Sequence, residues 1–97
     1  MEDKIKKLDE IRKHIDRLDT VLITTLAERF SLMPEIARLK KESNLPIFQE
    51  KREQEIMKNL LAIAEKNGLE KSFVEEVFLS VFNEAKRIQH NIIKKSK

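Results

Sequence analysis

Apolar residues recur at steps of three and four through roughly the first forty positions, in a stretch that has no Gly and a single Pro. This spacing places them on one face of an α-helix. The pattern predicts one long helix from about Asp3 to Glu42. Its apolar stripe is formed by Leu8, Ile11, Ile15, Leu18, Leu22, Leu26, Met33 and Ile36.

The length of this helix bears on the assembly. About 40 helical residues extend roughly 60 Å, which is more than the width of a domain of 97 residues. One chain cannot cover the whole stripe, and a second copy packed along it is the economical solution. We therefore expect a homodimer with interlocked long helices.

Pro34 lies inside this helix, where proline removes one backbone hydrogen bond and costs about 3 kcal/mol. We expect a kink near Phe30. The alternative is a true break, with two helices joined by a turn around Leu32 to Pro34. No Gly, Asn or Asp lies there to form a turn, so the kink is favoured.

Two further helices are predicted. Ser43-Asn44-Leu45-Pro46 ends the first one, because Asn tolerates a left-handed cap and the residue before Pro disfavours helix. The second helix runs from about Gln49 to Lys66 and ends at Asn67-Gly68-Leu69, with Gly in the left-handed position. Its inner face carries Ile56, Leu60 and Ile63.

A capping box, Ser72 with Glu75 three residues later, predicts the start of the third helix, from about Ser72 to Lys94. The expected fold class is all-α: three helices per chain with a long N-terminal helix, one domain over residues 1–97, and an intertwined homodimer. The apolar face of the third helix comprises Val74, Phe78, Val81, Ala85, Ile88 and Ile92.

The net charge of +3 changes this picture little, because Lys and Arg are interleaved with Asp and Glu almost throughout. No aromatic residues alternate with basic ones, so we expect no nucleic-acid partner. Without Cys, a signal-like segment or an apolar run long enough to span a bilayer, we expect a cytoplasmic protein with no membrane partner.

Metal and covalent chemistry are also not expected. His14 and His90 lack the spacing of a metal motif, and there is no Gly-rich phosphate loop and no Cys nucleophile. The sequence predicts no metal and no cofactor. The polar residues that remain are suited to binding anions and stabilising charge.

Two basic residues lie where the long stripe calls for apolar ones. At 100° per residue, Arg29 falls within about 20° of Leu22 and Ile36, and Lys40 within about 20° of Arg29. Each alone could extend to the edge of the stripe, or Arg29 could pair with a buried carboxylate. Two on one stripe favour an anion site between helices.

The second helix repeats this anomaly in its first turn. Gln49, Arg52 and Glu53 fall within about 60° of Ile56 and so face the core side. The exposed N–H groups and positive dipole there favour a bound carboxylate or phosphate. Taken singly, Glu53 is also explained as an acid matching the helix dipole, and Arg52 as its exposed neighbour.

Gln89 and Arg12 lie at the borders of their apolar faces. Gln89 follows Ala85 by one turn, where an amide could face a ligand or simply be solvated. Arg12 lies at the flank of the long stripe, where it could reach a partner subunit or pair with Asp16 at i+4.

In order, Arg12, Leu26-Ala27-Glu28-Arg29, Lys40, Pro46, Arg52-Glu53 and Gln89 resemble the all-helical (type II) chorismate mutases. The resemblance covers nearly the whole chain. Single segments could arise by chance, but the full register of charged positions is specific. It implies an intertwined dimer with two equivalent sites that rearranges chorismate to prephenate in the biosynthesis of Phe and Tyr.

The resemblance also implies roles for individual residues. Arg29 and the partner subunit's Arg12 bind the substrate carboxylates, with Arg52 adding positive charge. Lys40 and Gln89 face the ether oxygen, and Glu53 takes the ring hydroxyl. Some members carry an acidic residue and a serine near that hydroxyl, where this chain has Gln49 and Ala85.

The residue types in the sequence fit this reaction independently of the resemblance. A pericyclic step needs the substrate held in a compact conformer and hydrogen-bond donors to its ether oxygen, but no nucleophile. We expect a monofunctional enzyme. One alternative is an isochorismate-pyruvate lyase on the same scaffold. Another is a non-catalytic helical dimerisation or nucleic-acid-binding module, in which the basic residues are merely tolerated.

Overall fold

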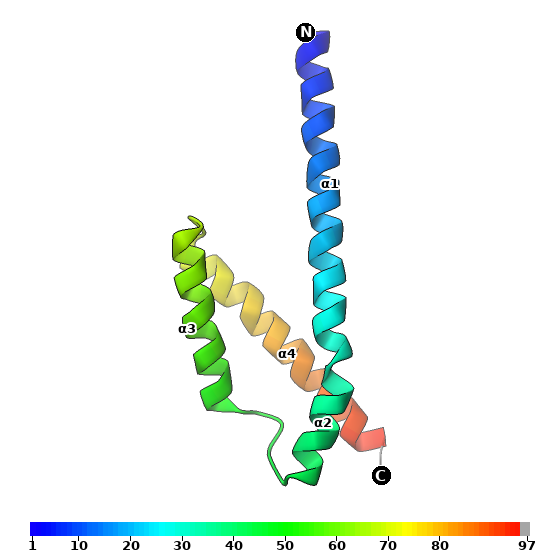
Figure 1. Cartoon of the computed structure of the whole chain (residues 1–97), viewed down its shortest axis with the longest axis vertical. Coiled ribbons are helices and arrows are strands. Elements are labelled where there is room, and N and C mark those ends of the chain that lie inside the picture. The colour runs from blue at the N-terminus through cyan, green and yellow to red at the C-terminus, as the bar shows by residue number, and fades with distance from the viewer. Residues whose placement is uncertain (96–97) are drawn as a thin grey trace. The chain divides into compact units, whose positions relative to one another are not determined.

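The computed structural model describes residues 1–95, and all regular structure among them is helical. The helices are α1 (Glu2–Ser31), α2 (Met33–Glu42), α3 (Glu50–Lys66) and α4 (Lys71–Lys95) (Figure 1). The all-α prediction is confirmed, with α1 and α2 together replacing the predicted long helix. Residues 1–32 and residues from 33 onward form two separate units, which are described in turn.

The boundary between α1 and α2 is one residue, Leu32. Its dihedral angles stay right-handed helical (φ −83°, ψ −14°), and its N–H bonds to the carbonyl of Arg29 at 3.3 Å. Pro34 follows as the second residue of α2 and has no N–H to offer Phe30. The prediction of a continuous, kinked helix therefore holds only in part. Leu32 is a single turn residue between two separate helices, so the alternative of two helices joined by a turn around Leu32 to Pro34 also holds in part.

α1 is a straight rod (Figure 1), and none of its 30 residues is buried. From Leu8 to Leu22 the apolar stripe is about half exposed, with Ile11 at 57%, Leu18 at 50% and Leu22 at 63%. Because large aliphatic side chains gain about 1.5–3 kcal/mol each on full burial, the stripe is a strong candidate for contact with another surface.

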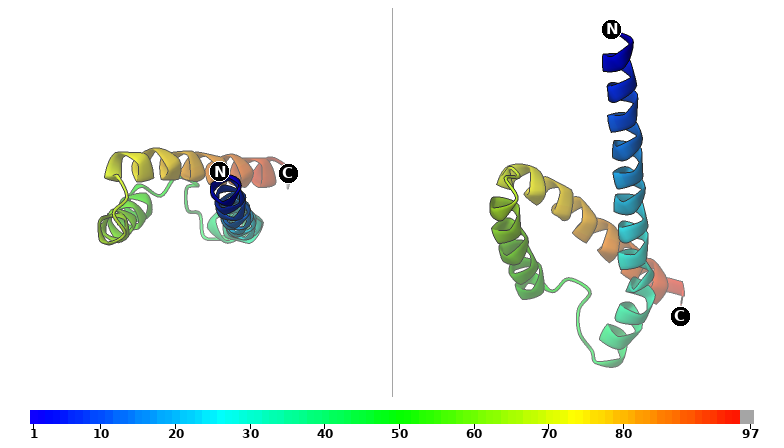
Figure 2. Two further views of the ribbon diagram at one scale, coloured as in Figure 1. Left: turned by 90° about the horizontal axis from the view of Figure 1, so that it is seen from above. Right: turned by 45° about the horizontal axis from the view of Figure 1, so that its top comes forward.

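In the second unit, α4 lies across both α2 and α3, which contact different parts of its length (Figure 2). Val74, Val81 and Ala85 of α4 are buried, as predicted. Ile63 is 55% exposed, so its predicted inward position is wrong: α3 turns Ala64 toward α4 instead. The buried residues of this unit are Met33, Ala37, Ala64, Val74, Val81, Phe82, Ala85 and Gln89.

The predicted helix stops are confirmed. Asn44 has a left-handed backbone (φ 56°), and the N–H of Leu45 closes back on the carbonyl of Lys40 at 2.8 Å. Gly68 is left-handed as well (φ 69°) and ends α3 in the same manner. Both ends fix where the loop after α2 and the turn into α4 begin.

The start of α4 differs from the prediction. The carbonyl of Glu70 accepts the first helical hydrogen bond, from the N–H of Val74 at 3.2 Å, and Lys71 is the first helical residue. Ser72 therefore lies inside the helix and is not its N-cap, so the capping-box prediction with Glu75 is wrong.

None of the helices in the described residues is long and apolar enough to cross a membrane.

Candidate active site

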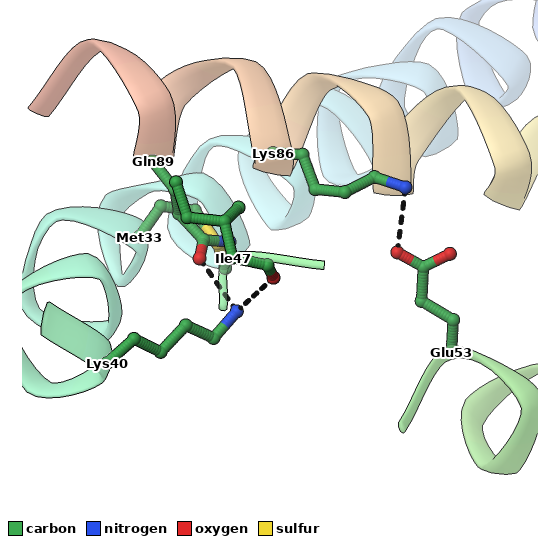
Figure 3. A network of polar contacts seen from close by, with 6 residues as sticks. All are labelled: Met33, Lys40, Ile47, Glu53, Lys86 and Gln89. Atoms are coloured by element: carbon green, nitrogen blue, oxygen red, sulfur yellow. Dashed lines mark hydrogen bonds and ion pairs between the residues drawn. The ribbon is translucent and has the colours of Figure 1, made fainter. Parts of the chain in front are cut away.

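The ammonium group of Lys40 connects three segments of the second unit (Figure 3). Its Nζ donates to Oε1 of Gln89 on α4 at 2.8 Å and to the carbonyl oxygen of Ile47, in the loop after α2, also at 2.8 Å. An ammonium has three N–H donors, so one remains for a ligand beyond these two bonds. The sequence prediction that Lys40 faces inward agrees with this geometry.

Gln89 is buried, with 4% of its surface exposed, whereas the sequence placed it at a border. The physical reason is the packing of α2 against α4, which covers this position. The amide is satisfied by the ammonium of Lys40 and by Sδ of Met33, which accepts from Nε2 at 3.4 Å. Because a thioether is a weak acceptor, this N–H can exchange Sδ for a ligand oxygen as its hydrogen-bond acceptor at little cost.

The surroundings of Lys40 lower its pKa below the ordinary value of 10.5. The largest cause is burial, which disfavours the charged form. The carboxylate of Glu53 acts in the opposite direction, and the ammonium of Lys86 lowers the pKa further. The ammonium therefore lies in a partly desolvated place, where its attraction to a developing negative charge is stronger than in water.

Glu53, in the first turn of α3, points toward α4 and pairs with Lys86 (Figure 3). Its Oε2 lies 3.0 Å from Nζ of Lys86, and the two side chains are only 22% and 23% exposed. The prediction that Glu53 faces the core side agrees with this position. Sequence reasoning missed Lys86, although it lies three residues before Gln89 and hence on the same side of α4.

Arg52 does not share that orientation, so its predicted inward position is wrong. Its side chain is 63% exposed and pairs with Glu55 at 2.5 Å. Successive helical residues point about 100° apart, and once Glu53 faces α4 its neighbour turns outward. Gln49 is half-buried just before α3, where its amide donates to the carbonyl of Pro46 at 2.7 Å.

Arg12 and Arg29 belong to the first unit. Arg12 is 66% exposed and lies 4.0 Å from Asp9, not beside Asp16 as one alternative had it. Arg29 is half-buried in the last turn of α1. The structure therefore brings together Lys40, Gln89, Glu53 and the previously unnoticed Lys86, and leaves the two α1 arginines on a separate unit.

Fold and site together define an all-helical protein in which an ammonium, an amide and a carboxylate meet between helices. The family model for chorismate mutase type II matches residues 11–90, and the chain belongs to that family. The family predicted from the register of charged residues is thereby confirmed.

Three relatives illustrate the match. The chorismate mutase of Methanocaldococcus jannaschii is 27% identical over 95% of this chain and 93% of its own length. The bifunctional chorismate mutase/prephenate dehydratase of Buchnera aphidicola (subsp. Baizongia pistaciae) is 37% identical over 87% of this chain, but over only 23% of its own length. The T-protein of Haemophilus influenzae is 30% identical over 84% of this chain and 22% of its own. The chain thus spans under a quarter of these two longer relatives.

Proposed function

We propose that this chain catalyses the rearrangement of chorismate to prephenate in the biosynthesis of Phe and Tyr. The observation that carries the proposal is the Lys40–Gln89 pair, an ammonium and an amide held 2.8 Å apart in a partly desolvated place. Membership of the chorismate mutase type II family supports it.

The ether oxygen is the atom at which charge develops, because its bond to the ring breaks as the new carbon–carbon bond forms. The remaining N–H of Lys40 and the amide N–H of Gln89 are the donors for that oxygen. Pre-positioned donors of this kind are each worth about 10²–10³-fold in rate. No proton has to move, which agrees with donors that only stabilise charge at the ether oxygen.

The arginines bind the substrate carboxylates. Arg29 and the partner subunit's Arg12 bind them, and Arg52 adds positive charge. Arg52 can turn toward a ligand because its present partner, Glu55, is an exposed i+3 neighbour, and such pairs contribute only about 0–1 kcal/mol. Glu53 accepts the ring hydroxyl, with Gln49 and Ala85 at the neighbouring positions.

A site that includes the partner subunit's Arg12 requires a dimer. The support for a dimer is the apolar stripe of α1, along which no α1 residue is buried in the described part of the chain. Two antiparallel or parallel copies of such a helix can cover one another's stripe. We propose that residues 1–97 act as one domain of this intertwined homodimer, and a cytoplasmic location stays a prediction of the sequence.

Two substrates separate this proposal from its nearest rival. The purified chain is incubated with chorismate and, separately, with isochorismate, and products are resolved by chromatography. Prephenate from chorismate supports the mutase. Release of pyruvate from isochorismate, with no prephenate from chorismate, would instead assign the chain as a lyase, and binding without turnover of either would favour a non-catalytic module.

The lowered pKa of Lys40 predicts a basic limb in the pH profile of kcat. Only the protonated ammonium can donate to the ether oxygen, so kcat should fall as pH rises through a value below 10.5. The fall should be absent from a variant that already lacks the ammonium, Lys40→Met, whose residual activity should be flat over the same range. Stopped assays from pH 6 to about pH 10.5 measure both profiles. A wild-type profile without this limb would contradict the role of Lys40.

A further inference from the structure

Lys86 has an environment that the roles above leave unexplained. Its ammonium lies 3.0 Å from Oε2 of Glu53 and 4.6 Å from the centroid of the Phe48 ring. The aromatic face and the carboxylate thus hold it from two sides. The three residues come from the loop after α2, the first turn of α3, and α4.

We propose that Lys86 is a positioning residue that orients the Glu53 carboxylate toward the ring hydroxyl of the substrate. The inference rests on the proposed function and deepens it. Lys86 engages one carboxylate oxygen, Oε2, which leaves Oε1 with its lone pairs to accept from a hydroxyl. A glutamate side chain has several rotatable bonds, and a partner at 3.0 Å restricts them.

The neighbouring positions make this orientation matter. Ala85 is buried and has no polar side-chain atom. Gln49 uses its amide nitrogen on the carbonyl of Pro46. Glu53 points to α4, where it pairs with Lys86, so recognition of the hydroxyl depends on how firmly that carboxylate is held.

A purely structural role for Lys86 is the rival explanation, because it ties the loop and α3 to α4. The two roles differ in their dependence on the substrate. An orienting role acts only on a substrate that carries the ring hydroxyl. A structural tie affects every substrate of the site to the same extent.

The experiment uses three variants of the full chain and two substrates. Lys86→Met removes the charge and keeps the length of the stem, and Lys86→Arg keeps the charge. Arg87→Met is the matched control: it also removes one positive charge from α4, but Arg87 is 59% exposed and pairs with Glu84 away from Glu53. The substrates are chorismate and a chorismate analogue that lacks the ring hydroxyl.

For chorismate, Lys86→Met should lower kcat/KM by roughly tenfold, the factor expected for one charge-assisted hydrogen bond. The loss should appear chiefly in KM, because the hydroxyl is bound before and during the reaction. For the deoxy analogue the loss should be under about twofold. Lys86→Arg should recover most of the activity, and Arg87→Met should match wild type.

An equal loss on both substrates would make Lys86 a structural tie and overturn the inference, as would an unchanged Lys86→Met variant. Both outcomes leave chorismate turnover by the wild-type chain intact and so spare the proposed function. Absence of that turnover would instead reject the proposed function, and the inference with it.

Discussion

Replacing Lys40 with Met should reduce kcat for chorismate by about 10²–10³-fold, the usual cost of removing one donor from a developing oxyanion. The stem of the side chain is retained, but the ammonium that bonds to Gln89 and Ile47 is lost. Gln89 Oε1 would then lie buried without its donor, so the free energy of unfolding should also fall by about 1–3 kcal/mol. Steady-state kinetics and thermal melts measure the two effects.

The matched control for this prediction is Arg38→Met. Arg38 lies on the same helix two residues earlier and is exposed, so the substitution removes the same charge without touching Gln89. It should leave kcat within about twofold of wild type, as is usual for surface changes. A Lys40→Met enzyme with wild-type kcat, or an Arg38→Met enzyme equally impaired, would show that the Lys40–Gln89 pair is not the donor set.

The second large effect is expected from Leu22→Glu on α1. Leu22 lies on the apolar stripe and is 63% exposed in the single chain. If a second copy covers the stripe, two buried glutamates would face a desolvation cost of several kcal/mol each, and the dimer should dissociate. Activity should be lost with it, because the partner subunit's Arg12 no longer reaches the site. Light scattering after size exclusion reports the mass.

Thr20→Glu is the control for charge and helix propensity. Thr20 lies on the same helix, about 160–200° around the axis from Leu18 and Leu22, and its substitution introduces the same charge off the stripe. This variant should remain dimeric and active. A monomeric wild-type chain with full activity would contradict the dimer, and so would a dimeric, active Leu22→Glu variant.

Helix ends were the features most accessible from the sequence. Asn44 and Gly68 are left-handed in the structure, as expected, because the rules for ending a helix depend on a few neighbouring residues. The helix of α1 and its apolar stripe could also be predicted, because the apolar residues recur at steps of three and four. The interruption at Leu32 was only half anticipated, since Pro34 disturbs the residues before it and the position of the disturbance depends on how the freed carbonyls are satisfied.

The polar site was less accessible, because its geometry depends on how α2 and α3 pack on α4. A helical projection placed both Arg52 and Glu53 near the core side. In the structure α3 is rotated so that Glu53 faces α4 and Arg52 faces outward. The burial of Gln89 depends on how α2 packs against α4. From the sequence alone Lys86 is indistinguishable from a surface lysine, because its role depends on the positions of Phe48 and Glu53.

The proposed site rearranges chorismate and is completed by an arginine of the partner subunit. The most direct test is to refold Arg12→Ala and Arg29→Ala chains together in equal amounts and measure chorismate turnover. In a mixed dimer one of the two sites has both arginines, so the mixture should show about one quarter of wild-type activity. Each variant alone should be nearly inactive. A mixture no more active than its components would contradict a shared site.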